Sequence, residues 1–346
     1  MMKVSKAKSI AAEWVLQNTS KEKWFMGAYF SGSTVVMSED ADMSPYSDVD
    51  VVVVTSQEEI PLKLGKFVYK NVLLEVTYLS WDLFAAVEEV LTSYHLAGSF
   101  RVNTIIADPT GHFHKLYAEV VKQFAKREWV TKRCENARSK IENGLRGFDQ
   151  SAPFHDQVTS WVFPAGITTH VILVAALKNP TVRLRYLAAR KVLMEYGFTD
   201  VYTELLELLG CARLTPQQVE GHLDQLAQTF DLTAAVSKTP FFFSSDITPS
   251  ARPIVIDGSR HLIRTGYHRE TIFWIIATFA RCHKILAADA PPSLQREQTP
   301  AFEALLADIG ITSTSDLIRR GNDVNQFLPK LWKTTERIIA ANKSVF

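Results

Sequence analysis

Residues 44–55 read SPYSDVDVVVVT, and this stretch decides how the first part of the chain folds. The four consecutive valines at 51–54 are typical of a strand that is buried on both faces of a sheet. The proline and serines before them predict a turn that leads into this strand. Asp48 and Asp50 stand where the strand begins, although a buried carboxylate without a cationic partner is costly. The stretch therefore predicts a sheet with a charged site at the start of one of its central strands.

The chain around this strand alternates between helix and strand patterns as far as residue 126. The two apolar segments at 65–70 and 72–79 are joined so tightly near Asn71 that we expect a hairpin. The expected strands are 24–30, 49–54, 65–70, 72–79 and 103–108, and the expected helices are 5–18, 80–92 and 111–126. This mixture predicts a mixed sheet in an α+β domain, with an α/β domain as the alternative.

After residue 126 the apolar residues recur with the period of an α-helix, so we expect a mostly helical second domain. The expected helices are 130–147, 156–177, 181–196, 200–209, 215–229, 268–288, 301–308 and 323–342. The segment 237–260 interrupts this pattern with three prolines, and we expect a long loop or a small strand excursion there. The fold class is therefore α+β, with one domain at 1–126 and a helical domain at 127–346.

Composition limits the classes of function and the location of the chain. The formal net charge of +1 over 346 residues argues against a large nucleic-acid interface. Cys134, Cys211 and Cys282 are far apart in the sequence, which predicts reduced thiols, no structural zinc and a cytoplasmic protein. The apolar stretches 161–177 and 271–286 contain polar or charged residues and are expected to be buried helices, not membrane spans.

Five residues of the first domain form the candidate site. Asp48 and Asp50 lie two residues apart, so they point to the same face of their strand. Two carboxylates so close together favour a cation between them, and Mg²⁺ prefers such oxygen ligands. Glu75 is a single carboxylate within the apolar strand 72–79 and would complete such a site. Gly32 and Ser33 follow the first strand, where a glycine backbone and a hydroxyl can contact phosphate.

The order of these motifs resembles the nucleotidyltransferase superfamily that includes DNA polymerase β. That family shares a GS pair, a spacer, a DxD pair and a third carboxylate on a later strand; here these are Gly32-Ser33, Asp48-x-Asp50 and Glu75. The run PYSDVD is closest to the aminoglycoside-modifying, antibiotic nucleotidyltransferase branch. The resemblance covers roughly the first 110 residues, and it identifies residues 1–126 as the catalytic domain and residues 127–346 as the acceptor-binding domain.

The resemblance implies transfer of a nucleoside monophosphate from a nucleoside triphosphate, with ATP expected, to a hydroxyl of a small-molecule acceptor. Pyrophosphate is the other product, and an aminoglycoside-like antibiotic is one expected acceptor. Asp48 and Asp50 would bind one or two Mg²⁺ ions, and Glu75 would complete the second metal site or act as the general base. Gly32 and Ser33 would bind the β- and γ-phosphates. No membrane or nucleic-acid partner is expected, and the oligomeric state is left open.

The segment after Ser33 departs from the family pattern. It reads TVVMSEDADM, is longer than usual, and lacks the basic residue that many members carry shortly after the GS pair. A nucleotide-binding regulator without turnover is therefore an alternative, as is nucleotidyl transfer to a protein or RNA. In the second domain, the cations Arg183, Arg185, Arg190 and Lys191 are interpreted either as triphosphate contacts or as a solvated helix face.

Overall fold

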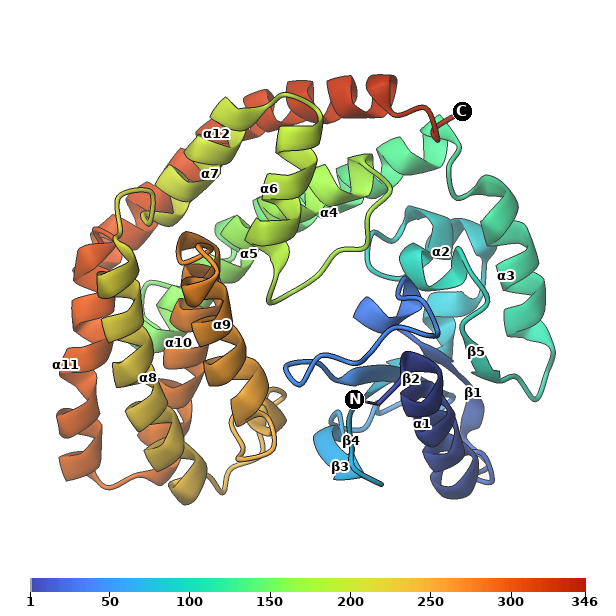
Figure 1. Ribbon diagram of the computed structural model, residues 1–346, viewed down its shortest axis with the longest axis horizontal. Helices are drawn as coiled ribbons and strands as arrows, with labels where there is room; N and C mark the ends of the chain where they lie inside the picture. Colours follow the sequence, from blue (N-terminus) through green and yellow to red (C-terminus); the bar gives the residue numbers. More distant parts are fainter. Residues whose placement is uncertain (1) are drawn as a thin grey trace. The chain divides into compact units, whose positions relative to one another are not determined.

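The computed structural model describes residues 2–346 (Figure 1), which form two compact units. Among the described residues, the sheet unit comprises residues 2–133, Leu177–Pro180 and Lys343–Phe346, and the helical unit comprises Cys134–Ala176 and Thr181–Asn342. A small mixed sheet in the N-terminal part and a mostly helical C-terminal region confirm the expected α+β class at this coarse level. The chain passes from one unit to the other within helix α4, Arg127–Arg146.

The sheet has five strands in the order β3-β4-β2-β1-β5. Their bounds are β1 Phe25–Phe30, β2 Val49–Thr55, β3 Gly65–Tyr69, β4 Val72–Ser80 and β5 Ile105–Ala107. Strands β2 and β4 are parallel, and the other neighbours are antiparallel. The valine strand β2 is therefore central, as its apolar run predicts. Lys70 and Asn71 both have positive φ at the β3–β4 hairpin, which is the backbone geometry that tight hairpin turns need.

Apolar side chains cover both faces of this sheet. One core contains Val51 and Val53 with residues of helix α1, Val4–Asn18, and the other contains Val52 and Val54 with residues of helix α3, His112–Gln123. Alternate valines thus face opposite cores, which explains why the strand contains no polar residue after Asp50 until Thr55.

Two expected elements of this unit differ from the structure. The expected helix 80–92 is divided into a 3₁₀ turn, Trp81–Phe84, and a short helix α2, Val87–Thr92. Ala86 has extended backbone angles between them and interrupts the helical hydrogen bonds. The expected strand 103–108 is paired only at Ile105–Ala107.

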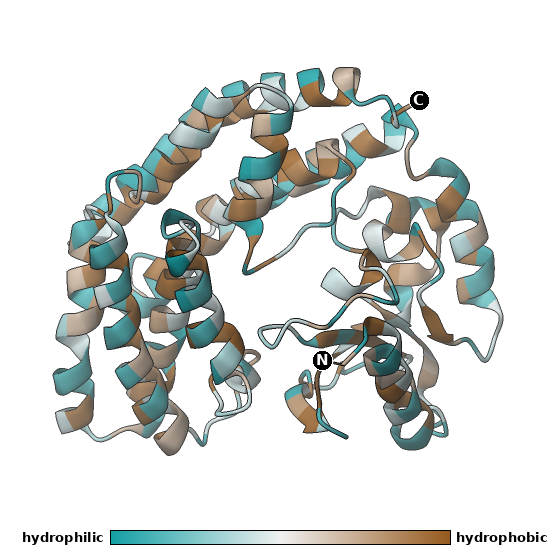
Figure 2. Ribbon diagram, in the orientation of Figure 1, coloured by the Kyte–Doolittle hydropathy of each residue, from teal (hydrophilic) through white to brown (hydrophobic). Residues whose placement is uncertain are grey.

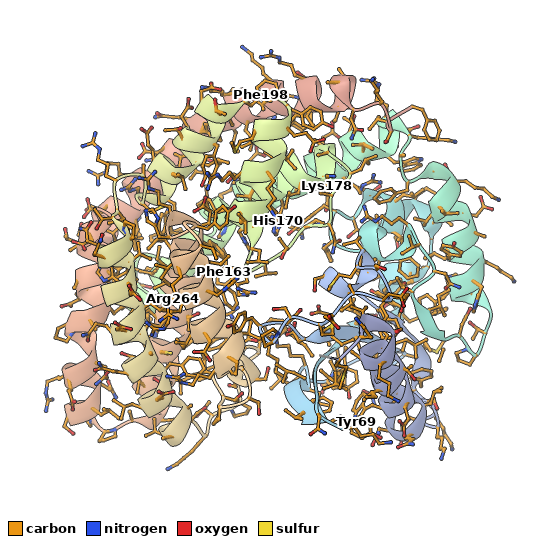
Figure 3. The ribbon with its side chains drawn as sticks, viewed as in Figure 1. Tyr69, Phe163, His170, Lys178, Phe198 and Arg264 are labelled. Carbon is orange, nitrogen blue, oxygen red and sulfur yellow. The ribbon has the colours of Figure 1, made fainter. Side chains whose placement is uncertain are left out.

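The helical unit is built from α5 Phe154–Ala175, α6 Arg185–Glu195, α7 Thr199–Leu209, α8 Pro216–Val236, α9 Gly258–Arg264, α10 Ile272–Asp289, α11 Pro292–Asp308 and α12 Thr314–Ala341. Side chains fill the space between these helices (Figure 3). The outer helices α8, α11 and α12 carry apolar residues beside hydrophilic ones along their length (Figure 2). The strand excursion considered for 237–260 is not formed; the segment contains a 3₁₀ turn at Ser244–Asp246 and a π-helical turn at Pro253–Asp257.

Two helices of this unit are long and apolar enough to cross a membrane by length and composition alone. They are Phe154–Ala175 and Arg269–Asp289, and 78% of the most apolar window of each is buried inside the protein. Helix α5 packs against α10 and α12. This burial is what the sequence predicts for core helices, and the cytoplasmic location stays a prediction.

Candidate metal centre

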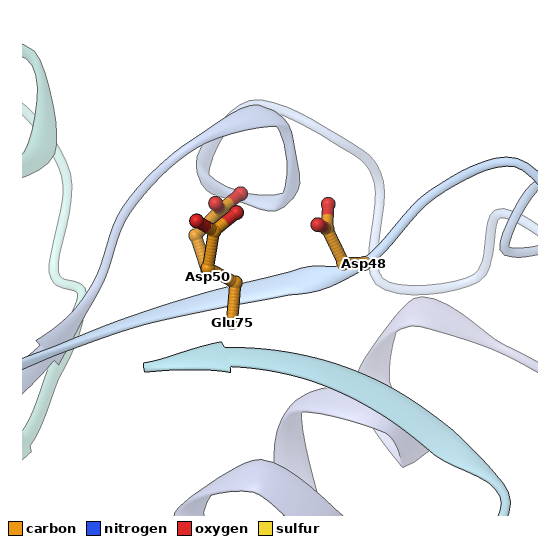
Figure 4. Close-up of side chains that lie close together, drawn as sticks. All are labelled: Asp48, Asp50 and Glu75. Atoms are coloured by element: carbon orange, nitrogen blue, oxygen red, sulfur yellow. The ribbon is translucent and has the colours of Figure 1, made fainter. Parts of the chain in front are cut away.

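Strand register brings the predicted carboxylates together. Asp50 on β2 is paired with Glu75 on β4, and Glu75 is in turn paired with Lys66 on β3. Asp48 lies two residues before Asp50, at the entry to β2. The three carboxylates project to the same side of these strands (Figure 4). The alternation of a strand therefore explains why two separate segments supply one cluster.

The spacing of the carboxylates suits a cation. One oxygen each from Asp48, Asp50 and Glu75 lies within 4.8 Å of the others, and all three side chains are partly buried. Among residues 2–346, these three carboxylates are the cluster of acidic, histidine or cysteine side chains whose spacing could hold a metal ion. Mg²⁺ and Ca²⁺ take carboxylate oxygens at about 2.0–2.6 Å, so one ion fits among oxygens at this separation.

The electrostatics of the cluster point the same way. Burial raises the pKa of Asp50 well above its ordinary value, and the neighbouring charges of Asp48 and Glu75 raise it further. Burial also raises the pKa of Asp48, against the opposing effect of Lys66. The fold therefore holds acidic oxygens where their negative charge is unfavourable, and a bound cation would relieve that cost. This donor set fits a hard divalent cation.

Two lysines, which the sequence analysis did not single out, lie inside the cluster. Lys63 Nζ donates to Glu75 Oε1 at 2.7 Å. Lys66 Nζ donates to Glu75 Oε2 and lies 3.3 Å from Asp48 Oδ2. The expected hairpin near Asn71 contained the signal for Lys66, because a tight turn there places residue 66 opposite residue 75.

Gly32 is in direct contact with the cluster. Its φ of 66° and ψ of −149° are backbone angles that essentially only glycine adopts. A Cβ atom at this position would lie 1.7 Å from Asp50 Oδ2, so the backbone of Gly32 occupies the space beside that carboxylate. Ser33 is exposed and begins a 3₁₀ turn of three residues, Ser33–Val35. A long helix whose N-terminus would add to phosphate binding does not follow Ser33.

A second missed contributor comes from the segment Leu177–Pro180, which belongs to the sheet unit. Asn179 Nδ2 donates to the carbonyl oxygen of Gly32 at 2.8 Å. Arg101 Nη1 donates to the carbonyl oxygen of Leu177 at 2.6 Å. Lys178, labelled in Figure 3, lies between these two contacts in the sequence. In the sequence, residues 177–180 look like an ordinary connection between helices. No pattern there predicts that Asn179 holds the turn at Gly32 in place.

The cations considered in the helical unit have other contacts. The Arg185 guanidinium is buried and lies 3.9 Å from the centre of the Phe273 ring. Arg190 Nη1 donates to Glu270 Oε1 at 2.8 Å, and the Tyr202 hydroxyl donates to the same oxygen. The interpretation of this helix as a solvated face is therefore wrong for Arg185, and Arg190 has a structural partner. These contacts lie inside the helical unit.

A scan against protein-family models finds no match to this chain, and a search of curated proteins finds none either.

Proposed function

We propose that this protein is a metal-dependent nucleotidyltransferase. It transfers a nucleoside monophosphate from a nucleoside triphosphate, with ATP the expected donor, to a hydroxyl group of a small-molecule acceptor. The observation that carries the proposal is the convergence of Asp48, Asp50 and Glu75 within 4.8 Å beside the backbone of Gly32. Phosphoryl-type transfer needs mainly positioning and neutralisation of charge, and these groups are suited to both tasks.

Each residue has a role that follows from its place. Asp48 and Asp50 would hold Mg²⁺ through their carboxylate oxygens. A bound ion would neutralise phosphate charge and lower the pKa of the acceptor hydroxyl. Gly32 lets the backbone approach a phosphate closely, and the exposed Ser33 hydroxyl is free to donate to a phosphate oxygen. The resemblance alone assigns Glu75 to a second ion or to the hydroxyl proton, whereas in the structure both of its carboxylate oxygens accept from lysine ammonium groups.

In the reaction, the acceptor oxygen forms a bond to the α-phosphorus of the nucleotide. The bond between that phosphorus and the oxygen of the leaving group breaks, pyrophosphate departs with the bonding electron pair, and the proton of the acceptor hydroxyl passes to solvent water. An aminoglycoside-like acceptor in the cytoplasm is the most specific form of the proposal, and it is supported by the PYSDVD run at 45–50. Residues 127–346 are the proposed acceptor-binding domain.

The test is a pyrophosphate-release screen of ATP, GTP, CTP and UTP against aminoglycosides and sugars. We expect Mg²⁺-dependent release with at least one pair of substrates, and no release after Asp48→Asn or Asp50→Asn. The matched control is Asp42→Asn, since Asp42 is exposed and pairs with Lys3 away from the carboxylate cluster. Circular dichroism would check that all variants are folded. Undiminished release by both variants of the cluster would refute the proposal.

A second candidate is a nucleotide-binding regulator without turnover. The observation that favours it is the segment at 34–43, which contains no lysine or arginine to bind a triphosphate. Its acidic residues Glu39 and Asp42 instead pair with Lys8 and Lys3. Calorimetry would then detect binding of ATP with Mg²⁺ while the same screen releases no pyrophosphate. Mass spectrometry for a nucleotidylated protein or RNA would test the macromolecular acceptor.

A further inference from the structure

The carboxylate cluster already contains two positive charges of its own. Lys63 Nζ lies 2.7 Å from Glu75 Oε1, and Lys66 Nζ contacts Glu75 Oε2. The side chains of the two lysines are 6% and 9% exposed. A lysine so deeply buried is found only where its charge is paired. These contacts are therefore part of the built site and are not loose surface ion pairs.

The fold fixes Lys66 in this position. It is paired with Glu75 across the β3–β4 hairpin, so the two side chains lie side by side on one face. Lys66 Nζ is also 3.3 Å from Asp48 Oδ2 and bridges two of the three carboxylates. Lys63 lies just before β3 and reaches the other oxygen of the same glutamate. The two ammonium groups thus approach Glu75 from one hairpin strand and the loop that leads into it.

The carboxylates are consequently not equivalent. Both oxygens of Glu75 accept from an ammonium group, and Asp48 shares one oxygen with Lys66. Within residues 2–346, the Asp50 side chain has no ion pair or hydrogen bond. A carboxylate whose two oxygens are engaged in this way is a poor metal ligand and a poor base. The position left for a divalent cation lies at Asp48 and Asp50.

We propose that the ammonium groups of Lys63 and Lys66 occupy the place of a second metal ion at Glu75. The site then binds one divalent cation, at Asp48 and Asp50, and not two. The inference rests on the proposed function, because it specifies how the same site is charged for nucleotidyl transfer. Lys63 and Lys66 are positioning residues, which hold Glu75 and reduce the negative charge around the ion. Three carboxylates and two ammonium groups leave one net negative charge, against three without the lysines.

The test counts the ions that bind to the full-length protein in the absence of nucleotide. Mn²⁺ is the probe, because electron paramagnetic resonance of the free ion gives the number bound per chain. We expect one Mn²⁺ for the natural sequence and two for the double variant Lys63→Met, Lys66→Met. Lys66→Arg keeps the charge and should still bind one. We also expect calorimetry to show at least tenfold tighter binding of the first ion to the double variant.

The matched control is Lys70→Met. Lys70 follows the same strand but pairs with Glu13, so its removal should leave the count at one. Two ions bound by the natural sequence would overturn the inference while leaving the proposed function intact. A folded double variant that binds only one ion would overturn it as well. No bound ion in the natural sequence would overturn both this inference and the metal-dependent reaction, whereas one ion without pyrophosphate release would refute the reaction alone.

Discussion

Replacing Gly32 by alanine tests the link between the backbone of the GS turn and the carboxylate cluster. The added Cβ would lie 1.7 Å from Asp50 Oδ2 and 2.4 Å from Asp50 Cγ. Contacts below 3.0 Å are essentially never seen for real Cβ atoms, so the carboxylate oxygen must move by about 1.3 Å or more. Because metal sites keep their ligand distances to within about 0.2 Å, Asp50 cannot remain a ligand in its present position.

The structure sets the size of both expected effects. A misplacement of about 1 Å costs about 100-fold in activity, so we expect at least that loss in pyrophosphate release. We also expect Mn²⁺ to bind at least 10-fold more weakly, since shifting even an outer partner of a ligand costs about 10–100-fold. The backbone angles of Gly32 add a separate cost, because a residue with a side chain there is strained by about 1–3 kcal/mol.

Gly111→Ala is the control for this experiment. Gly111 also has positive φ, 73°, but a Cβ atom there meets no atom within 4 Å. The substitution should therefore lower the free energy of unfolding by about 1–2 kcal/mol and leave Mn²⁺ affinity unchanged. Thermal unfolding and Mn²⁺ titration of both variants separate the two effects. Wild-type Mn²⁺ affinity in folded Gly32→Ala would refute the role assigned to the Gly32–Asp50 contact.

Two further substitutions test other parts of the structure. Asn179→Ala removes the 2.8 Å hydrogen bond to the Gly32 carbonyl oxygen, whose loss costs about 0.5–1.5 kcal/mol. We therefore expect calorimetry to show that ATP binds roughly 3–10-fold more weakly. Unchanged ATP affinity would contradict this expectation. His283 is buried against Phe302, and burial lowers its pKa from 6.5 to about 4. His283 therefore becomes protonated near pH 6.5 in the unfolded chain but only near pH 4 in the folded chain. Because the unfolded chain binds more protons between these values, the free energy of unfolding decreases by up to about 3 kcal/mol as the pH is lowered from 6.5 to 4. His283→Leu should remove that part of the slope in urea unfolding at pH 7 and pH 4.5, and an unchanged slope would show that His283 is not its source.

The sequence predicts the sheet well because its signals are local. Consecutive valines indicate a buried central strand, and the alternation of side chains along a strand is enough to assign Asp48 and Asp50 to one face. The hairpin near Asn71 is equally local, since a tight turn fixes the pairing of the strands on either side of it. Glu75 could therefore be expected beside the aspartates once its strand was recognised as a neighbour of β2.

The missed residues have different causes. Lys66 occupies a strand of mixed polarity, where a lysine usually indicates an exposed position, although the tight hairpin near Asn71 places it opposite Glu75. Asn179 contacts Gly32 across 147 residues of sequence. The apolar spacing continues through Ala86 and therefore predicts a longer helix than the observed 87–92, although the backbone at Ala86 is extended. Such contacts and breaks depend on tertiary packing, which a single sequence does not specify.

Two separate sets of contacts thus act on Asp48 and Asp50. The lysines act through charge, because Lys66 contacts Asp48 directly and holds Glu75 beside Asp50. Asn179 acts through geometry, because it holds the carbonyl oxygen of Gly32, whose Cα faces Asp50. A charge effect weakens as salt is added, although burial limits the screening, while a steric effect does not depend on salt. Metal affinity measured across a range of ionic strength should therefore change more steeply for variants of the lysines than for variants of Gly32 or Asn179, which separates the two contributions within one site.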